Sequence, residues 1–130
     1  MIKAKFLYQG GEGEFTKLFE NLSPDDKIAV MSAFDFDTDT PVVVCKNESN
    51  LIVISDEHLY IYIQQGHRVA IIPHGTIEKV SYHVNFKAYP GKSPQDFDLL
   101  ELITKSMHIT ITIEKGKAFT SFYQALMLFV

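Results

Sequence analysis

The middle of the chain reads LIVISDEHLYIYIQQGHRVAIIP over residues 51–73. Three segments rich in Ile, Val and Tyr, residues 51–55, 59–64 and 68–73, are separated there by two polar turns. Short apolar segments of this composition, bounded by turn residues such as Gly66, are typical of β-strands. The stretch therefore predicts three consecutive short strands, and it decides the fold class.

Further strands are predicted on both sides of this stretch. Residues 42–45 form an apolar run after the turn-prone segment 37–41. Two later segments, 80–86 and 107–113, alternate apolar and polar side chains, as strands do when one face lies on the core and the other in water. A strand is also expected near residues 97–104. Many short strands at intervals of about 8–12 residues indicate a β-sandwich or a β-barrel.

Residues 28–36 are predicted to form one more strand. Ile28, Val30, Phe34 and Phe36 share one face at a period of two, which is the side-chain period of a strand. This segment and residues 42–45 are either two strands or one long strand interrupted near the proline at position 41. Counted separately, they bring the number of candidate strands to eight.

The N-terminal segment is predicted to lie outside the barrel. Residues 1–8 are expected to form a short edge strand or a loose tail, and a glycine-rich stretch follows at 10–13. An amphipathic helix is predicted over residues 14–22, because apolar residues recur there at the helical spacing i, i+3, i+4 and i+7. These residues are Phe15, Leu18, Phe19 and Leu22. The proline at position 24 is expected to end this helix.

Residues 117–129 are predicted to form a C-terminal amphipathic helix that covers one open end of the barrel. An apolar stripe runs along it through Phe119, Phe122 and Leu126. The apolar residues at its end cannot all face one side. Met127 or Leu128 is therefore left on the outer surface as a dimer or partner contact, or packs on the predicted helix 14–22.

The composition indicates one globular domain without a disulfide. A chain of 130 residues with 46% hydrophobic residues is long enough to bury a sizeable core. We therefore expect a single domain over residues 1–130, with a tail and helix at 1–23 and the barrel and C-terminal helix at 24–130. The single cysteine, Cys45, excludes an intramolecular disulfide and is predicted to be a buried apolar residue.

The charge of the chain argues against two classes of partner. The net charge is −4 and the isoelectric point is about 5.7, whereas nucleic acids and anionic membranes select proteins with an excess of Lys and Arg. We therefore expect no nucleic acid as a partner, and a membrane lipid is disfavoured. The N-terminus lacks an apolar targeting segment, so a cytoplasmic location is predicted.

Residues 51–62 and 72–80 together resemble the bacterial pleckstrin-homology-like (PH-like) and GRAM-like domains. Those families show two hydrophobic strands around a Thr/Ser-Asp-x-Arg turn, followed by the pattern I-P-x-x-x-I-x-x-V. The matching residues here are Ile72, Pro73, Ile77 and Val80, and His58 stands in place of the family's Arg. The resemblance covers residues 24–130. It implies a mostly β, PH-like antiparallel barrel of two packed sheets, capped by a C-terminal α-helix.

Two groups of polar residues contain side chains that can bind cations. The pattern Asp35-x-Asp37-x-Asp39 lacks the Gly and Glu that an EF-hand loop needs at its sixth and twelfth positions, so a solvated turn is predicted there. The histidines match no metal-ligand spacing and are predicted to lie on the surface. They are His58, His67, His74, His83 and His108. No metal site is predicted, although His83 and His108 are expected on polar strand faces where they could meet.

No nucleophile motif, phosphate-binding loop or dinucleotide fingerprint is present in the sequence, so neither an enzyme nor a cofactor is predicted. The long loop after residue 86 is the candidate binding surface, because long loops often carry function. Its candidate ligand-binding residues are Lys87, Tyr89 and Lys92.

Three functions follow as hypotheses. The first is a non-enzymatic interaction module that binds a protein or peptide, for example by strand addition at a sheet edge, or that self-associates. The second is a module that binds a lipid or membrane surface. The third is a small-ligand pocket or an enzyme, which would require a deep pocket with convergent polar groups.

Overall fold

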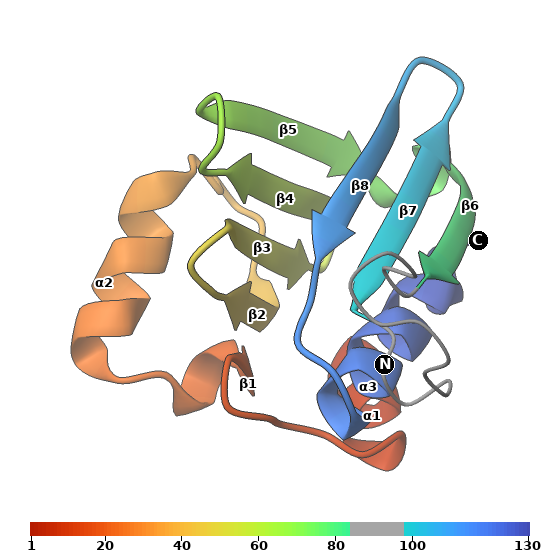
Figure 1. The fold of residues 1–130 in the computed structure, drawn as a ribbon. Helices are drawn as coiled ribbons and strands as arrows, with labels where there is room; N and C mark the ends of the chain where they lie inside the picture. Colours follow the sequence, from red (N-terminus) through yellow and green to blue (C-terminus); the bar gives the residue numbers. More distant parts are fainter. Residues whose placement is uncertain (84–97) are drawn as a thin grey trace.

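The computed structural model describes residues 1–83 and 98–130, which form short helices and two antiparallel sheets (Figure 1). The N-terminal elements are α1 (Ile2–Tyr8), β1 (Thr16–Leu18), the 3-10 helix η1 (Phe19–Asn21) and α2 (Pro24–Ala33). The central elements are β2 (Pro41–Lys46), β3 (Asn50–Ser55), β4 (His58–Ile63), β5 (Arg68–Pro73) and η2 (His74–Thr76). The last are β6 (Ile77–His83), β7 (Leu99–Thr104), β8 (His108–Thr112), α3 (Lys117–Leu126) and η4 (Met127–Phe129).

The two sheets contain all eight strands of the described residues. One sheet has the order β1-β2-β3-β4-β5 and the other the order β6-β7-β8, and every pairing is antiparallel. The strands predicted from residues 51–73 are confirmed, as are those near 42–45, 97–104 and 107–113. The predicted closed barrel is wrong in this form, because the two sheets share no strand pair within the described residues.

The main core lies between the two sheets and is closed by α3. Phe122 and Leu126 of α3 are fully buried in one cluster with Ile52 of the first sheet and Leu102 of the second. The predicted C-terminal helix is thus confirmed, and its apolar stripe faces the core. Met127 and Leu128 are half-buried against the same cluster.

A second, smaller core lies on the opposite face of the five-stranded sheet. Val30 of α2 and Phe34, which directly follows the helix, pack there against Val53 and Tyr60. Val53 and Tyr60 alternate along their strands with residues of the main core. The Phe34 and Tyr60 rings lie 5.4 Å apart. α2 therefore covers the outer face of the middle strands.

The strand predicted over residues 28–36 is wrong, because residues 24–33 form α2. Ser23 is the N-cap and accepts a hydrogen bond from the amide of Asp26 at 3.2 Å, Pro24 occupies the first turn, and Asp25 also lies in that turn. Ser at the N-cap, Pro just inside the helix and acidic residues in the first turn are start signals for a helix. The alternation at 28–36 was therefore misleading.

The helix predicted over residues 14–22 is also wrong. Thr16 to Leu18 form β1, which pairs with β2 in the register Thr16↔Cys45 and Leu18↔Val43, and η1 follows. Leu18 is buried while Phe15 is 47% exposed, so the apolar residues do not share one face. Pairing with the edge of β2 overrides the local helical spacing.

Residues 1–8 form neither an edge strand nor a loose tail. Residues 2–8 are the helix α1, and its Ile2 and Phe6 are buried at a spacing of four residues in the main core. α1 contacts α3 (Figure 1). The expected packing of the C-terminal helix on an N-terminal helix is thus provided by α1 instead of by residues 14–22. None of the described helices is long and apolar enough to cross a membrane.

Candidate functional site

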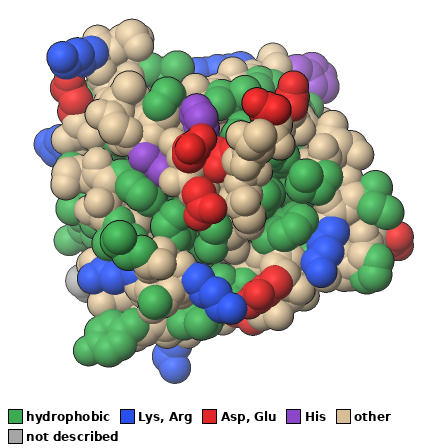
Figure 2. Space-filling model, turned by 180° about the vertical axis from the view of Figure 1, so that it is seen from behind, with side chains coloured by type: hydrophobic (Ala, Val, Ile, Leu, Met, Phe, Trp, Pro, Cys, Tyr) green, Lys and Arg blue, Asp and Glu red, His purple; other side chains and the backbone are tan. Residues whose placement is uncertain are grey.

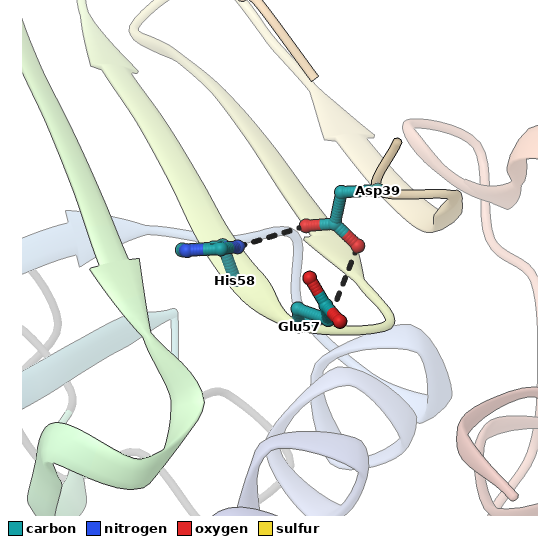
Figure 3. Close-up of side chains that lie close together, drawn as sticks. All are labelled: Asp39, Glu57 and His58. Atoms are coloured by element: carbon teal, nitrogen blue, oxygen red, sulfur yellow. Dashed lines mark hydrogen bonds and ion pairs between the residues drawn. The ribbon is translucent and has the colours of Figure 1, made fainter. Parts of the chain in front are cut away.

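Three side chains with metal-ligating atoms come together where the chain enters β2 and where β3 turns into β4. Asp39 precedes β2, and Glu57 and His58 lie at the turn between β3 and β4 (Figure 3). Their ligand atoms all lie within 4.8 Å of one another. The Asp39 side chain is only 3% exposed, so the prediction of a solvated turn is wrong at this residue.

The carboxylate of Asp39 is surrounded by hydrogen-bond donors. Its Oδ2 accepts from the hydroxyl of Ser55 at 2.5 Å and from that of Tyr60 at 3.0 Å, and the Nδ1 of His58 lies 3.0 Å away. Its Oδ1 accepts from the amide of Glu57 at 3.0 Å (Figure 3). Burial by itself would raise the pKa of Asp39, but these hydrogen bonds outweigh it and lower the pKa, so the carboxylate stays ionised.

The same arrangement raises the pKa of Tyr60 to about 12. Burial is the main cause, followed by the hydrogen bond to Asp39 and its negative charge. The Tyr60 hydroxyl is therefore a stable donor at neutral pH and not a general base.

The hydrogen bonds around Asp39 indicate a structural role for this cluster and disfavour a cation site. Oδ1 also accepts from the amide of Thr40 at 3.0 Å, so five protein donors face a group with roughly four lone-pair sites. A cation would have to displace these donors. The cluster ties the segment before β2 to the turn between β3 and β4, which fixes the start of β4.

His74 is a second ionisable residue for which the predicted surface position is wrong. It is buried, its Nε2 lies 2.6 Å from the carbonyl of Ser55, and its ring stacks on Phe129 with centroids 3.6 Å apart. Its Nδ1 has no hydrogen-bond partner among the described residues. Burial lowers the pKa of His74, which favours the neutral ring. No local pattern at 74–76 signals this burial.

Two further histidines lie in the three-stranded sheet. β7 lies between β6 and β8, and the register places His83 opposite Leu99 and His108 opposite Ile103, so the two histidine positions lie at opposite ends of β7. His108 lies 3.2 Å from a carboxylate oxygen of Glu101. The His108 side chain is exposed, so the prediction that this histidine lies on the surface is confirmed.

A different feature stands out at the border of the five-stranded sheet. Among residues 1–83 and 98–130, β5 pairs with β4 alone, and it forms the upper border of the sheet in Figure 1. Val69 and Ile71 of β5 are 58% and 48% exposed. They lie opposite Tyr62 and Tyr60 in the register, so they extend the apolar outer face beyond the part that α2 covers.

The hydrogen-bond pattern decides which backbone groups of β5 face the free edge. In an antiparallel pair, residues that exchange hydrogen bonds with the neighbour alternate with residues whose amide and carbonyl groups point away. The amide of His74 donates to the carbonyl of Glu57 at 3.1 Å, so His74 is turned toward the neighbouring strand. Alternate residues share this orientation, which leaves Val69 and Ile71 with their amide and carbonyl groups directed at the free edge.

A groove adjoins the end of this edge. It has a volume of about 340 Å³ and lies between the end of β5, the start of β6 and the turn between β7 and β8. Its lining includes Ile72, Pro73, Glu78, Lys105 and Met107. The free backbone groups and apolar side chains of β5 thus lie next to a groove that contains one acidic and one basic residue, Glu78 and Lys105. This combination suits the binding of an extended peptide.

The sequence anticipated a sheet edge as a binding site but did not identify which one. The signal was the run Val69 to Ile72, which is apolar at every position and therefore apolar on both faces of its strand. The candidate residues Lys87, Tyr89 and Lys92 lie outside the described residues. The expectation that Cys45 is buried is confirmed, and burial raises the pKa of its thiol.

Comparison with known proteins bears on the fold. No family model and no curated protein matches the chain. It is similar to a crystal structure of a DUF1696 family protein with a pleckstrin-homology domain from Shewanella loihica PV-4, with a TM-score of 0.58 and 11% sequence identity. The match covers 90% of this chain and 98% of that one. At this identity the likeness concerns the fold alone, and the predicted PH-like fold is confirmed.

Proposed function

We propose that the chain is a non-enzymatic interaction module that binds an extended protein segment along the free edge of β5. The segment comes from a partner protein or from a second copy of the chain. The observation that carries this proposal is the free edge itself. The backbone groups of Val69 and Ile71 point to this edge, and their exposed apolar side chains stand beside it on the outer face of the sheet.

Strand addition uses both of these features. The main-chain groups of the edge supply affinity, and alternate side chains of the added strand supply specificity. Soluble proteins usually protect a sheet edge with charges, Pro or a covering element. β5 has only Arg68 at its start and Pro73 at its end, so its central residues are unprotected within the described part of the chain.

Two observations favour this role over the other hypotheses. The ionisable cluster at Asp39 is engaged by its own protein donors, which supports a structural role and not a catalytic one. On the face in Figure 2, Lys and Arg side chains are scattered among other residues instead of forming one continuous patch, which disfavours an anionic lipid surface there. The net charge of −4 acts in the same direction.

The test is selection of peptides from a displayed random library on the immobilised chain, followed by affinity measurement on an edge variant. Ile71→Pro removes an amide that faces the free edge and leaves the hydrogen bonds to β4 in place. We expect this variant to weaken binding at least about tenfold, equivalent to ~1.4 kcal/mol.

The matched control is Met31→Lys, on the exposed face of α2, which should leave the affinity unchanged. Circular dichroism of each variant verifies its fold. Equal affinity of the Ile71→Pro variant would place the binding site elsewhere. Binding to phosphatidylserine vesicles without any selected peptide would favour the lipid hypothesis instead.

A further inference from the structure

We infer that a second copy of this chain occupies the free edge of β5, as an antiparallel strand in a two-fold symmetric dimer centred on Ala70. This inference rests on the proposed function, because it specifies what the edge binds. Three features support it: the orientation of the backbone groups of β5, the side chains that a two-fold axis would bring together, and the opposite charges of Arg68 in β5 and Glu78 in the adjoining groove.

The orientation of the backbone selects the register. Two copies of β5 can exchange hydrogen bonds only through residues that face the free edge, which are Val69 and Ile71. With the axis at Ala70, Val69 of each copy lies opposite Ile71 of the other, and both pairs can exchange two hydrogen bonds. Shifting the axis to Ile71 would bring Pro73, which has no amide, into a bonding position. Ala70 is therefore the centre that uses the edge fully.

The side chains agree with this register. Val69 and the partner's Ile71 point to the same face, so the exposed apolar residues of each copy cover those of the other. Closed two-fold dimers are the commonest protein assemblies, and they consume the edge completely instead of propagating it. A self-complementary strand of this kind needs no foreign partner.

The charges provide the third argument. The register places Arg68 of one copy opposite the partner's Ile72, on the face that the groove adjoins. That groove contains Glu78 and also Lys105, and Glu78 offers the negative charge that an incoming guanidinium would pair with. Arg68 is exposed, and it forms no ion pair with any other residue of 1–83 or 98–130. By symmetry each dimer would contain two such Arg–Glu pairs.

Charge reversal tests the pairing. Sedimentation equilibrium of the full chain over a concentration series should show a dimer, and Arg68→Glu or Glu78→Arg alone should weaken it at least about tenfold by placing like charges together. The double variant restores opposite charges and should recover the dimer to within about threefold of the original. Lys79→Glu, on the neighbouring exposed residue, is the control and should change nothing.

Cross-linking tests the register independently. Residues directly opposite each other in a pair without hydrogen bonds have Cα atoms about 4.5 Å apart, which suits a disulfide. Ala70→Cys should therefore form a reducible dimer with oxidised glutathione. Val69→Cys should not, although Val69 is 58% exposed and Ala70 only 9%. Random collision would give the opposite order, and that result would overturn the proposed register.

A peptide separates failure of this inference from failure of the proposed function. The probe is a synthetic peptide with the sequence of residues 67–74, HRVAIIPH, together with the same peptide N-methylated at Val69 and Ile71. If the chain is monomeric throughout, yet binds the first peptide and not the second, the edge binds strands but the dimer is wrong. If the chain is monomeric and binds neither the first peptide nor any peptide selected from the random library at the β5 edge, both proposals fall.

Discussion

The five-stranded sheet has two borders, β1 and β5, and the chain treats them differently. At β1, the amide of Leu18 donates to Oε2 of Glu12 at 2.9 Å, and the carbonyl of Thr16 accepts from the amide of Gly13 at 2.9 Å. Thr16 and Leu18 are 0% and 3% exposed. At β5, Val69 and Ile71 have exposed side chains, and their backbone groups face the free edge without a bonding partner among the described residues.

The closed border is built by several parts of the chain. The carboxylate of Glu114, which follows β8, accepts from the amides of Glu14 and Phe15 at 3.0 and 2.7 Å. Gly13 makes this approach possible, because a Cβ there would lie 2.5 Å from Glu114 and 2.7 Å from Ala118. Within the described residues, side chains and backbone groups from other segments thus cover the β1 border, whereas none pairs with the free side of β5. Because exposed sheet edges are usually protected, the open edge of β5 suggests a function.

The largest effect that we expect concerns the turn that holds β4 and β5 in place. Asp39→Ala removes the acceptor for Ser55, Tyr60 and the amide of Glu57. Ser55 can still donate to the carbonyl of His58, but the buried Tyr60 hydroxyl is left without an acceptor. The free energy of unfolding should fall by about 3 kcal/mol. Urea unfolding measures it, with Asp56→Ala on the exposed part of the same turn as the control, expected within about 0.5 kcal/mol of the unchanged chain.

The pH dependence of Asp39 gives this prediction a second readout. The pKa of Asp39 is lower in the folded chain than its ordinary value of 3.8, so its stabilisation is fully present above that value and is lost as the pH falls through the folded pKa. Asp39→Asn should therefore lose less stability than the unchanged chain on acidification below about pH 4. Parallel acid profiles would contradict the assigned role.

The next largest effect should come from opening the closed border. Glu12→Ala leaves the amide of Leu18 without an acceptor in a buried position, which should cost about 1–2 kcal/mol in the free energy of unfolding. Cys45 of β2 is buried and lies opposite Thr16 of β1. Loosening of β1 in this variant should expose its thiol, so Cys45 should react faster with a thiol reagent.

Glu12→Gln is the matched control for the closed border. Its amide oxygen can still accept from Leu18, so most of the stability and the slow reaction of Cys45 should be retained. If Glu12→Gln and Glu12→Ala behave alike, the charge of Glu12 and not its hydrogen bond protects this border. That result would weaken the contrast between the two edges.

A smaller effect is expected from His74, which ends the ladder between β4 and β5. Burial is the main cause that lowers the pKa of His74, and it outweighs the hydrogen bond to the carbonyl of Ser55 and the negative charges of Asp39 and Asp56, which act in the opposite direction. A histidine with a lowered folded pKa stabilises the fold above its ordinary pKa and loses that contribution as the pH falls through it, because the unfolded chain then binds the proton first.

The measurement is the urea midpoint at about pH 7.5 and about pH 5.5, on either side of the ordinary histidine pKa of about 6.5. Stability should fall toward the lower pH. In His74→Gln, whose side-chain amide can still donate to the carbonyl of Ser55, the fall should be smaller. An equal fall in both chains would assign it to other histidines.

The sequence predicts the region from residue 41 onward well, because the strands there have clear apolar segments and turn residues between them. It fails before residue 41, where local and tertiary signals conflict. Residues 15–22 have helical spacing, yet Thr16 to Leu18 pair with β2. Pro24 can signal the end of one helix or the first turn of another, and here it lies in the first turn of α2. In a short segment, one strand pairing or one helix cap is enough to determine a secondary structure that differs from the one the apolar periodicity predicts.

The candidate site was less predictable than the fold for a related reason. Whether an edge is open depends on what covers it, and the groups that close the β1 border come from Glu12 and from Glu114, about a hundred residues away. The burial of Asp39 and His74 likewise depends on Ser55, Tyr60 and Phe129. Such long-range contacts leave no local pattern in the sequence.

The smallest effect should come from the open edge itself, and it tests the contrast most directly. Val69→Thr exchanges a methyl group for a hydroxyl at a 58% exposed position, so the free energy of unfolding should change by less than about 0.5 kcal/mol. The same substitution at Val43, which is fully buried opposite Leu18, puts a hydroxyl in the core and should cost about 1–3 kcal/mol.

Both variants should be measured at low protein concentration, where dissociation removes any contribution from a second copy. Repeating the measurement at high concentration should then separate the two positions again. If the proposed dimer forms, Val69→Thr should lose the extra stability that association gives the unchanged chain, because that dimer would bury this side chain. The cost of Val43→Thr should not depend on concentration. A Val69→Thr variant that is destabilised equally at both concentrations would mean that β5 is already covered within one chain, and the contrast between the two borders would disappear.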